Sequence, residues 1–241
     1  MAHKLLSKGL KKAYKGKAAV KGLDISVKTG EIVGLLGPNG AGKTTTFYMI
    51  VGMVKADSGE IFLDETDISS LPMYQRARMG ISYLPQEPSI FRRLTVRDNI
   101  RAILEIKGYN KTEIEEELLK LLEEFQLRDF SERKGIHLSG GERRRTEIAR
   151  TLATKPTFIL FDEPFAGIDP IAILELKNTL RYLKDKGIGI LLTDHNVRDT
   201  LSITDRAYII SDGAVLDEGE PDKLINNPEV RSAYLGEEFT L

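Results

Sequence analysis

A glycine-rich stretch of the sequence has residue types suited to binding phosphate. Residues 37–45 read GPNGAGKTT and match the pattern G-x-x-x-x-G-K-[ST]. Glycines let backbone N–H groups converge on phosphate oxygens, and the start of a following helix adds the positive end of its dipole. An ordinary glycine turn would not need the Gly-Lys-Thr sequence near the end of the stretch. The sequence therefore predicts a nucleotide-binding loop made of Gly37, Pro38, Asn39, Gly40, Ala41, Gly42, Lys43, Thr44 and Thr45.

Residues in and beyond this loop can act on a magnesium nucleotide. Lys43 can place its charge between the β- and γ-phosphates, and the hydroxyl of Thr44 can bind Mg²⁺. The stretch FILFDEP adds Asp162 and Glu163 at the end of an apolar run. Asp162 is placed to hold the metal through its water shell, and Glu163 to orient or deprotonate the attacking water. Either carboxylate alone could be a turn or a cap, but beside a phosphate loop the catalytic interpretation is favoured.

Polar residues after two other strand-like runs are further candidates. Gln86 follows GISYLP, and by itself it would be interpreted as a solvated loop residue. His195 ends GILLTDH, and the carboxyl ends of parallel strands are where functional groups gather. A single histidine is more often structural, but an imidazole there can hydrogen-bond a γ-phosphate or its attacking water. The surrounding motifs therefore make His195 a catalytic candidate.

A second pair of glycines occurs in LSGGE, far along the chain from the phosphate loop. Ser139 and Glu142 have the spacing of a capping box, so the simplest interpretation is a well-capped helix. A capped helix does not need glycine at both Gly140 and Gly141. Glycines there leave backbone N–H groups open to an anion, which raises the question of why one chain would carry two such sites.

Strand and helix patterns show how these residues are positioned. Apolar runs and alternations predict strands and a hairpin at 4–27 (two strands), 31–37, 59–68, 80–85, 157–164, 187–195 and 207–219, the hairpin turning at Asp212-Gly213. A helix is predicted over 43–54, and Asp169 and Pro170 open another through Leu183 as N-cap and first-turn proline. Between these parts the pattern is helical. Thr95 with Asp98, and Thr112 with Glu115, are the predicted helix caps there.

These elements predict an α/β fold whose parallel core has an antiparallel β edge and is interrupted by a helical insertion. The predicted nucleotide-binding core comprises residues 1–86 and 146–241, and the inserted helical subdomain comprises 87–145. Length alone allows one large domain or two small ones. We expect core and insertion together to form a single domain over residues 1–241.

The motifs GPNGAGKTT, Gln86, LSGGE, FILFDEP, AGID and His195 resemble, in order and spacing, the nucleotide-binding subunits of ATP-binding cassette (ABC) transporters. The resemblance covers essentially the whole chain. It implies the ABC ATPase fold with its P-loop NTPase core, ATP and Mg²⁺ as ligands, and a homodimer in which Ser139, Gly140 and Gly141 of one copy face the γ-phosphate held by the other. It also implies that Tyr14 stacks on adenine and that Asp169 belongs to a loop at the dimer interface.

The same resemblance assigns Gln86 to coupling the site to membrane subunits. We therefore expect Glu163, His195 and Gln86 as catalytic residues, and Thr44, Gln86 and Asp162 as metal ligands. FAGIDPIA, TDHNVRDTL and AYLGEEFTL are most similar to ATPases of lipopolysaccharide export, with ATPases of branched-chain amino acid importers as the alternative. In both groups the segment 88–96 lies near the groove that receives a permease helix.

Two transmembrane permease subunits of the lipopolysaccharide-export type are thus expected, contacted near Phe91, Arg92 and Arg93. An exposed loop with an incidental basic pair is the plain alternative for these residues. A soluble ABC ATPase of DNA repair or translation is less favoured, because such relatives usually carry a coiled coil or a second cassette. A nucleotide-binding switch would not need Glu163 beside Asp162.

Composition limits the remaining possibilities. The chain has 35 Lys+Arg against 36 Asp+Glu, so no overall basic field favours nucleic acid. It lacks cysteine, which excludes disulfides and thiolate metal sites. No apolar run approaches the roughly 20 residues that span a bilayer, and the lysine-rich N-terminus lacks a signal peptide's apolar core. We expect a cytoplasmic protein that is peripheral on the inner membrane and does not insert into it.

Overall fold

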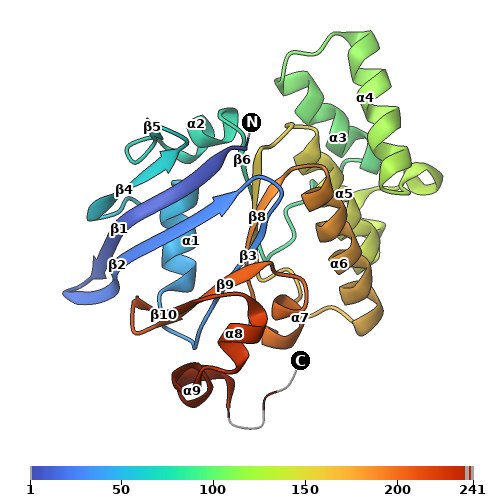
Figure 1. Ribbon diagram of the computed structural model, residues 1–241. Helices are drawn as coiled ribbons and strands as arrows, with labels where there is room; N and C mark the ends of the chain where they lie inside the picture. Colours follow the sequence, from blue (N-terminus) through green and yellow to red (C-terminus); the bar gives the residue numbers. More distant parts are fainter. Residues whose placement is uncertain (1, 237–238, 240–241) are drawn as a thin grey trace. The chain divides into compact units, whose positions relative to one another are not determined.

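The computed structural model describes residues 2–236 and 239, and the chain forms two compact units. The first joins Met1–Tyr83 with Thr157–Leu241, and the second is Leu84–Pro156 (Figure 1). The second unit is longer than the predicted insertion of 87–145, because the helix that begins after Ser139 continues to Leu152 and belongs to it whole.

The first unit is built on two β-sheets. One is antiparallel and has the order β2-β1-β4-β5, and the other has the order β10-β9-β3-β8-β7-β6. The strands are β1 (Lys4–Tyr14), β2 (Lys17–Lys28), β3 (Ile32–Leu36), β4 (Ser58–Leu63), β5 (Thr66–Asp67), β6 (Ile81–Leu84), β7 (Phe158–Asp162), β8 (Gly189–Thr193), β9 (Arg206–Ser211) and β10 (Ala214–Gly219). β3 runs parallel to β8 and β9, and β7 runs parallel to β8, while β10 is antiparallel to β9. Because β3, β7 and β8 are buried along their whole length, they appear in the sequence as continuous apolar runs.

Helices cover both faces of the larger sheet, as Figure 1 shows. Those of the first unit are α1 (Lys43–Val51), α2 (Met73–Arg78), α6 (Pro170–Asp185), α7 (Val197–Leu201), α8 (Pro221–Ile225) and α9 (Pro228–Val230), the last followed by a π-helical turn (Arg231–Leu235). Helix α1 packs between the two sheets, where Phe47 and Met49 share a core with Leu10 of β1 and Phe158 of β7. This core fixes the helix that follows the predicted phosphate loop.

Most predicted elements of the first unit are confirmed, with two differences. The run 59–68 is not one strand: β4 and β5 form a hairpin whose turn includes Asp64 at a φ of 55°. Aspartate tolerates this left-handed conformation better than most residues. Helix α2 was not predicted, since MYQRAR has no apolar periodicity. It is secured by Arg76, whose buried guanidinium donates to the carbonyls of Met49 and Ile50 at the end of α1.

The second unit consists of helices α3 (Val96–Ile106), α4 (Lys111–Glu124) and α5 (Gly140–Leu152), with short 3₁₀ turns at Arg128–Phe130 and Gly135–His137. The predicted cap of α3 is confirmed, because Thr95 Oγ1 accepts a hydrogen bond of 3.0 Å from the amide of Asp98. The capping box of α5 is also confirmed. Ser139 Oγ accepts from the amide of Glu142, and Glu142 accepts from the amide of Ser139.

The predicted capping box of α4, formed by Thr112 and Glu115, is wrong. The helix begins earlier, and Asn110 is its N-cap with Glu113 as the reciprocal partner. Asn110 Oδ1 accepts from the amides of Thr112 and Glu113 at 3.0 and 3.1 Å, and Glu113 accepts from the amide of Asn110 at 2.8 Å. Asparagine caps a helix as well as serine does, so Asn110 and Thr112 were both possible caps and the sequence pattern did not distinguish them.

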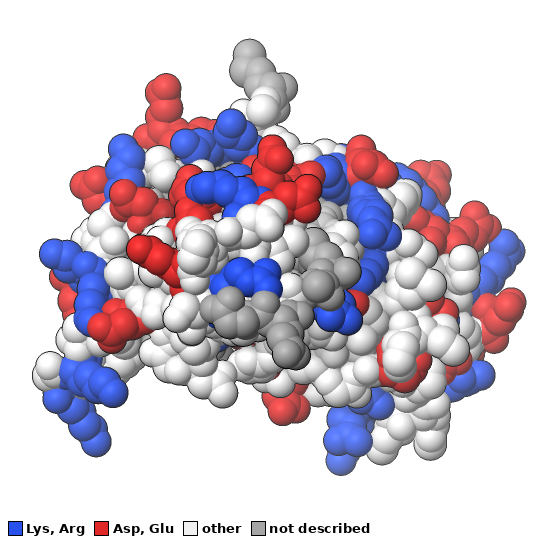
Figure 2. Space-filling model, turned by 60° about the horizontal axis from the view of Figure 1, so that its bottom comes forward, with Lys and Arg blue, Asp and Glu red and all other residues white. Residues whose placement is uncertain are grey.

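The charged side chains are mixed rather than gathered by sign on the face drawn in Figure 2, where blue and red residues are interspersed. This agrees with the balanced composition and gives no extended basic surface on that face for nucleic acid. In the part of the chain that the structure describes, no helix combines the length and apolar character needed to cross a bilayer.

Candidate nucleotide-binding site

The carboxyl ends of three parallel strands bring the predicted site together. β3 ends at Leu36 just before the glycine-rich loop, β7 ends at Asp162, and β8 ends at Thr193. Asp162 lies directly opposite Thr193 in the β7–β8 register. Glu163 and His195 therefore leave the same edge of the sheet as the loop at residues 37–42, where ligands bind in open α/β sheets.

The loop between β3 and α1 depends on glycine for steric reasons. Gly37 and Gly42 have φ values of 149° and 102°. A Cβ on Gly37 would lie 2.0 Å from the carbonyl oxygen of Ile210, and one on Gly42 would lie 2.5 Å from that of Ala19. The loop is thus pressed against the chain behind it, and its backbone curves around the end of α1 as phosphate binding requires.

Lys43 is the first residue of α1, and its amine is turned back into the loop. Its Nζ donates to the carbonyl oxygens of Gly37 and Pro38 at 2.6 and 3.0 Å. Burial lowers the pKa of Lys43, and the nearby charge of Glu163 partly opposes this effect. The residue is therefore a buried cation close to the carboxylate proposed below as the base.

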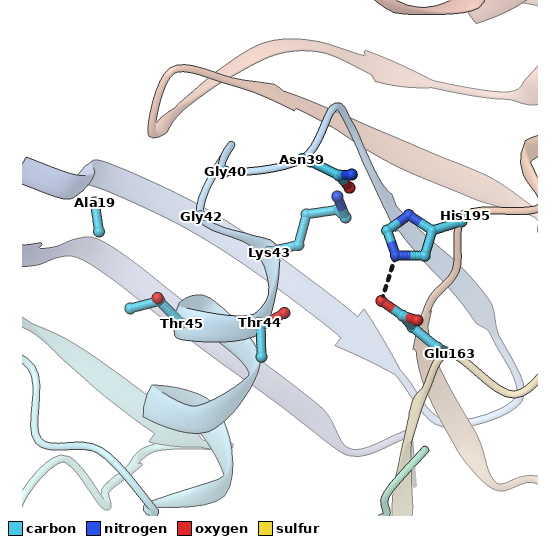
Figure 3. A pocket seen from close by; sticks show the side chains of 9 residues that line it. All are labelled: Ala19, Asn39, Gly40, Gly42, Lys43, Thr44, Thr45, Glu163 and His195. Carbon is cyan, nitrogen blue, oxygen red and sulfur yellow. Dashed lines mark ion pairs between the residues drawn. The ribbon is translucent and has the colours of Figure 1, made fainter. Parts of the chain in front are cut away.

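A cavity of about 410 Å³ lies in front of this loop. It is lined by Ala19, Asn39, Gly40, Gly42, Lys43, Thr44, Thr45, Glu163 and His195. Figure 3 shows Glu163 and His195 pointing toward each other and the amine of Lys43 ending beside Asn39, with Thr44 and Thr45 on the first turn of α1. Nε2 of His195 lies 2.7 Å from Oε1 of Glu163. The structure thus brings together the phosphate loop and two residues that the sequence predicts as catalytic.

The backbone of Glu163 is held in an unusual conformation. Its φ is 46°, in the left-handed region that a residue with a Cβ adopts only when its surroundings enforce it. Its amide donates to the carbonyl oxygen of Thr193 at 2.7 Å. The Glu163 side chain is 14 % exposed and that of His195 is 52 % exposed, so the carboxylate is shielded while the imidazole reaches solvent. Strain of this kind is concentrated at functional sites.

Asp162 precedes Glu163 at the end of β7, and its carboxylate accepts a hydrogen bond from a tyrosine. Burial raises the pKa of Asp162, and the charge of Asp194 raises it further. The hydrogen bond from Tyr83 lowers this pKa. The Tyr83 hydroxyl donates to Asp162 Oδ2 at 3.0 Å, and burial raises the pKa of Tyr83 itself. Sequence reasoning missed Tyr83 and Asp194, although they lie in the stretches GISYLP and GILLTDH, because their contacts depend on sheet order.

A second cavity of about 270 Å³ adjoins the first and shares Ala19 and Gly40 with it. Tyr14, Lys17, Ala18, Asp212 and Gly213 complete its lining. Tyr14 is 47 % exposed, so part of its ring is available for contact with a flat group. The predicted adenine-stacking residue therefore lies beside the predicted phosphate site.

Several predicted site residues belong to the second unit. Gln86, Ser139 and Gly140 are all exposed in it, and Gly141 is half-buried. A Cβ on Gly140 would have no heavy atom within 4 Å. The part of the chain that the structure describes therefore gives no steric reason for glycine at that position.

The side chains available for a metal are hard oxygen donors. Among the described residues, no group of three or more His, Cys, Asp or Glu side chains could hold an ion unaided. A carboxylate at Asp162 and a hydroxyl at Thr44, which is exposed on α1, fit Mg²⁺, which usually keeps waters and substrate phosphates among its ligands.

The sequence matches the family model described as ABC transporter over residues 20–166. The chain belongs to the ABC transporter ATPases. It is 58 % identical to a probable ABC transporter ATP-binding protein of Azorhizobium caulinodans, covering 97 % of this chain and 83 % of that one. It is 54 % identical to the lipopolysaccharide export system ATP-binding protein LptB of Acidithiobacillus ferridurans over 100 % of both chains. Identity to LptB of Escherichia coli strain K12 is 53 %, covering 98 % of this chain and 99 % of that one.

Solved structures of ABC ATPases have the same fold as this one. The ADP conformation of the ATP-binding cassette MJ1267 superposes with a TM-score of 0.86 at 31 % identity, covering 98 % of this chain and 99 % of that chain. The cassette MJ0796, solved as a dimer in a post-hydrolysis state with ADP and phosphate, superposes with a TM-score of 0.78 at 26 % identity, covering 90 % and 98 %. The predicted fold class and nucleotide binding are confirmed, and the chain is the ATPase subunit of a transporter.

Proposed function

We propose that this ABC ATPase hydrolyses MgATP with Glu163 as the group that orients or deprotonates the attacking water. The contact between Glu163 and His195, in a cavity also lined by Lys43, carries this proposal. A base must lie close to the water that attacks the γ-phosphate, and Lys43 marks where the β- and γ-phosphates bind. His195 then fixes the carboxylate from its solvent side and can hydrogen-bond the γ-phosphate or the water.

The other polar groups have binding roles in this proposal. Asn39, Gly40 and Gly42 present the loop to the phosphates, and Tyr14 stacks on the adenine in the adjoining cavity. Thr44, Asp162 and Gln86 hold Mg²⁺, directly or through water. When bound, this ion neutralises charge that develops on the phosphate oxygens. Tyr83 keeps the Asp162 carboxylate oriented by its hydrogen bond.

The functional unit in this proposal is a homodimer with two nucleotides between the copies. Ser139, Gly140 and Gly141 of one copy complete the site around the γ-phosphate bound by the other. The open space around Gly140 supports this role, because none of the described residues would clash with a side chain at this position. Asp169 caps α6 by accepting from the amides of Ile171 and Ala172, which orders the loop expected at the same interface.

The transported cargo is proposed to be lipopolysaccharide, with the subunit on the cytoplasmic face of the inner membrane. The full-length identity of 54 % to LptB supports this choice. The partners are then two transmembrane permeases of that exporter. Phe91, Arg92 and Arg93 are exposed and are the proposed contact. Their segment is anchored by the buried Asn99, which accepts from the amide of Phe91 and donates to its carbonyl. An ordered, exposed segment of this kind loses little entropy on binding.

The catalytic proposal is tested with Glu163→Gln. The amide keeps the size of the side chain but cannot take a proton, so steady-state hydrolysis should fall by about 100-fold or more. Binding of MgATP, followed with a fluorescent nucleotide, and ATP-dependent dimer formation should remain. Hydrolysis at the wild-type rate would remove Glu163 from the catalytic role. Exposed Glu229, outside the site, provides the matched control as Glu229→Gln, which should behave as wild type.

The cargo proposal is tested by purifying the tagged protein from solubilised membranes and identifying the membrane proteins that accompany it. Permeases of lipopolysaccharide export are expected. Permeases of a branched-chain amino acid importer would contradict the cargo and leave the ATPase proposal intact. Phe91→Ala should weaken this association without changing ATP binding.

A further inference from the structure

Asp194 is a buried carboxylate immediately after β8, and no sequence motif assigns it a role. The residue is 1 % exposed. Its Oδ2 accepts from the amide of Phe165 at 2.7 Å, and its Oδ1 accepts from the amide of Asn196 at 2.8 Å. Burial raises the pKa of Asp194, while hydrogen bonds from the amides of Asn196, Phe165 and His195 lower it. The charge is therefore held by backbone amides.

These amides belong to the two loops that carry the catalytic candidates. Phe165 follows Glu163 by two residues along the loop after β7, and Asn196 directly follows His195 on the loop after β8. A single carboxylate thus ties the loops to each other. The bond from the amide of Glu163 to the carbonyl oxygen of Thr193 makes a second tie between the same loops. Together the two ties fix the backbone from which the Glu163 and His195 side chains project.

A buried carboxylate is costly unless its hydrogen bonds are complete, and beside the amides only the charge of His195 is found to favour the ionised form of Asp194. Asp205 directly precedes β9, at the amino ends of the parallel strands of the same sheet, and is less buried than Asp194. It accepts from the amide of Ile32 at 2.8 Å, but it also pairs with Lys184 and its side chain is 39 % exposed. Asp194 thus accepts backbone amides from a fully buried position, whereas Asp205 does so while exposed and paired with a lysine.

We propose that Asp194 is a positioning residue that sets the contact between Glu163 and His195 and thereby the rate of ATP hydrolysis. The inference rests on the proposed function, in which Glu163 acts on the attacking water. Asp194 itself does not line the nucleotide cavity. It acts through the two loops, since a displacement of about 1 Å in a catalytic group can lower a rate by up to about 100-fold.

The test compares Asp194→Asn with Asp205→Asn. Asparagine keeps one acceptor oxygen, but its NH₂ group cannot accept and would face one of the two amides. For Asp194→Asn we expect kcat to fall about tenfold or more, with KM and nucleotide affinity changed by less than about threefold. Asp205→Asn should leave kcat within about twofold of wild type. An equal loss of kcat in both variants, or a change in KM alone, would overturn the proposal.

A second experiment places Asp194→Asn in the Glu163→Gln background. If Asp194 acts through Glu163, it should lower the residual hydrolysis of that background by much less than it lowers wild-type hydrolysis. An equal loss in both backgrounds would contradict the proposal. Wild-type activity in Glu163→Gln would instead contradict the proposed function, so the two failures can be told apart.

Should Asp194→Asn fold poorly, Asp194→Ser is the second variant, because a serine hydroxyl can still accept from the Asn196 amide while losing the tie to Phe165. The histidine ring signals in a nuclear magnetic resonance spectrum give a readout independent of turnover. In either folded variant the signal of His195 should shift while those of His3 and His137 stay in place. An unmoved His195 signal together with wild-type kcat would overturn the proposal.

Discussion

The hydroxyl of Tyr83 donates a 3.0 Å hydrogen bond to Oδ2 of Asp162, joining β6 to the carboxylate that ends β7. The bond stabilises the charged form of a side chain whose pKa is raised by burial. Because its pKa is raised, Asp162 takes up a proton more readily in the folded chain than in the unfolded one. The protonated form of Asp162 therefore adds to the stability of the folded chain at low pH, and this contribution is lost as the pH rises through the folded pKa.

Tyr83→Phe removes this hydrogen bond and should raise the pKa of Asp162 further. Protonated Asp162 cannot hold a metal, so the acid limb of the pH–rate profile should move to higher pH. The Mg²⁺ concentration for half-maximal hydrolysis should rise more at pH 6 than at pH 8. Tyr208→Phe is the control, since its hydroxyl bonds the amide of Ser26 instead. Parallel pH profiles for wild type and Tyr83→Phe would show that the bond does not tune Asp162.

Gly140→Ala should separate folding from function. Among the described residues, no heavy atom beyond its own helix turn lies within 4 Å of a Cβ there, and alanine favours a helix by up to about 1 kcal/mol over glycine. Thermal stability should therefore stay the same or rise, while hydrolysis falls by about tenfold or more because the methyl group enters the space for the partner's phosphate. Gly42→Ala, which meets the Ala19 carbonyl, should instead lower stability. Full activity in Gly140→Ala would count against the composite site.

Mixed dimers test the same site from the other side. Lys43→Ala chains cannot bind phosphate, and Ser139→Arg chains cannot complete a partner's site. A dimer containing one of each retains one intact composite site, so ATP-dependent association should be stronger in the mixture than in either variant alone. Analytical ultracentrifugation with and without ATP measures this. If neither the mixture nor the wild type associates more with ATP, the two-copy arrangement is wrong.

Asn110→Ala should lower the free energy of unfolding by about 1 kcal/mol, because the amides of Thr112 and Glu113 lose their acceptor. For a chain of this size that corresponds to a fall of about 2–4 °C in Tm. Thr112→Ala is the matched control two residues away and should change Tm far less. A larger fall in Tm for Thr112→Ala than for Asn110→Ala would instead support Thr112 as the helix cap.

Much of the site could be predicted because its chemistry is local. The residues from Gly37 to Thr45 form one loop and one helix start, and Asp162 and Glu163 end one strand. Their meeting with His195 follows from the parallel sheet, which collects strand ends on one edge.

Other features depend on distant contacts or on competing local signals. The bonds from Tyr83 to Asp162 and from the Phe165 amide to Asp194 connect residues separated by 79 and 29 positions. No periodicity in the sequence encodes such pairs. The prediction of the α4 cap was wrong for a different reason, because Asn110 and Thr112 are both residue types that cap helices.

The bonds from Lys43 to the carbonyl oxygens of Gly37 and Pro38 hold its ammonium group in place within the loop. An ammonium group has three hydrogens, so a third remains for a ligand, and an anionic phosphate oxygen forms the strongest hydrogen bond with it in a buried position. A nucleoside without phosphates has no such oxygen. The loop thus orients its lysine for a polyphosphate before any adenine contact is made.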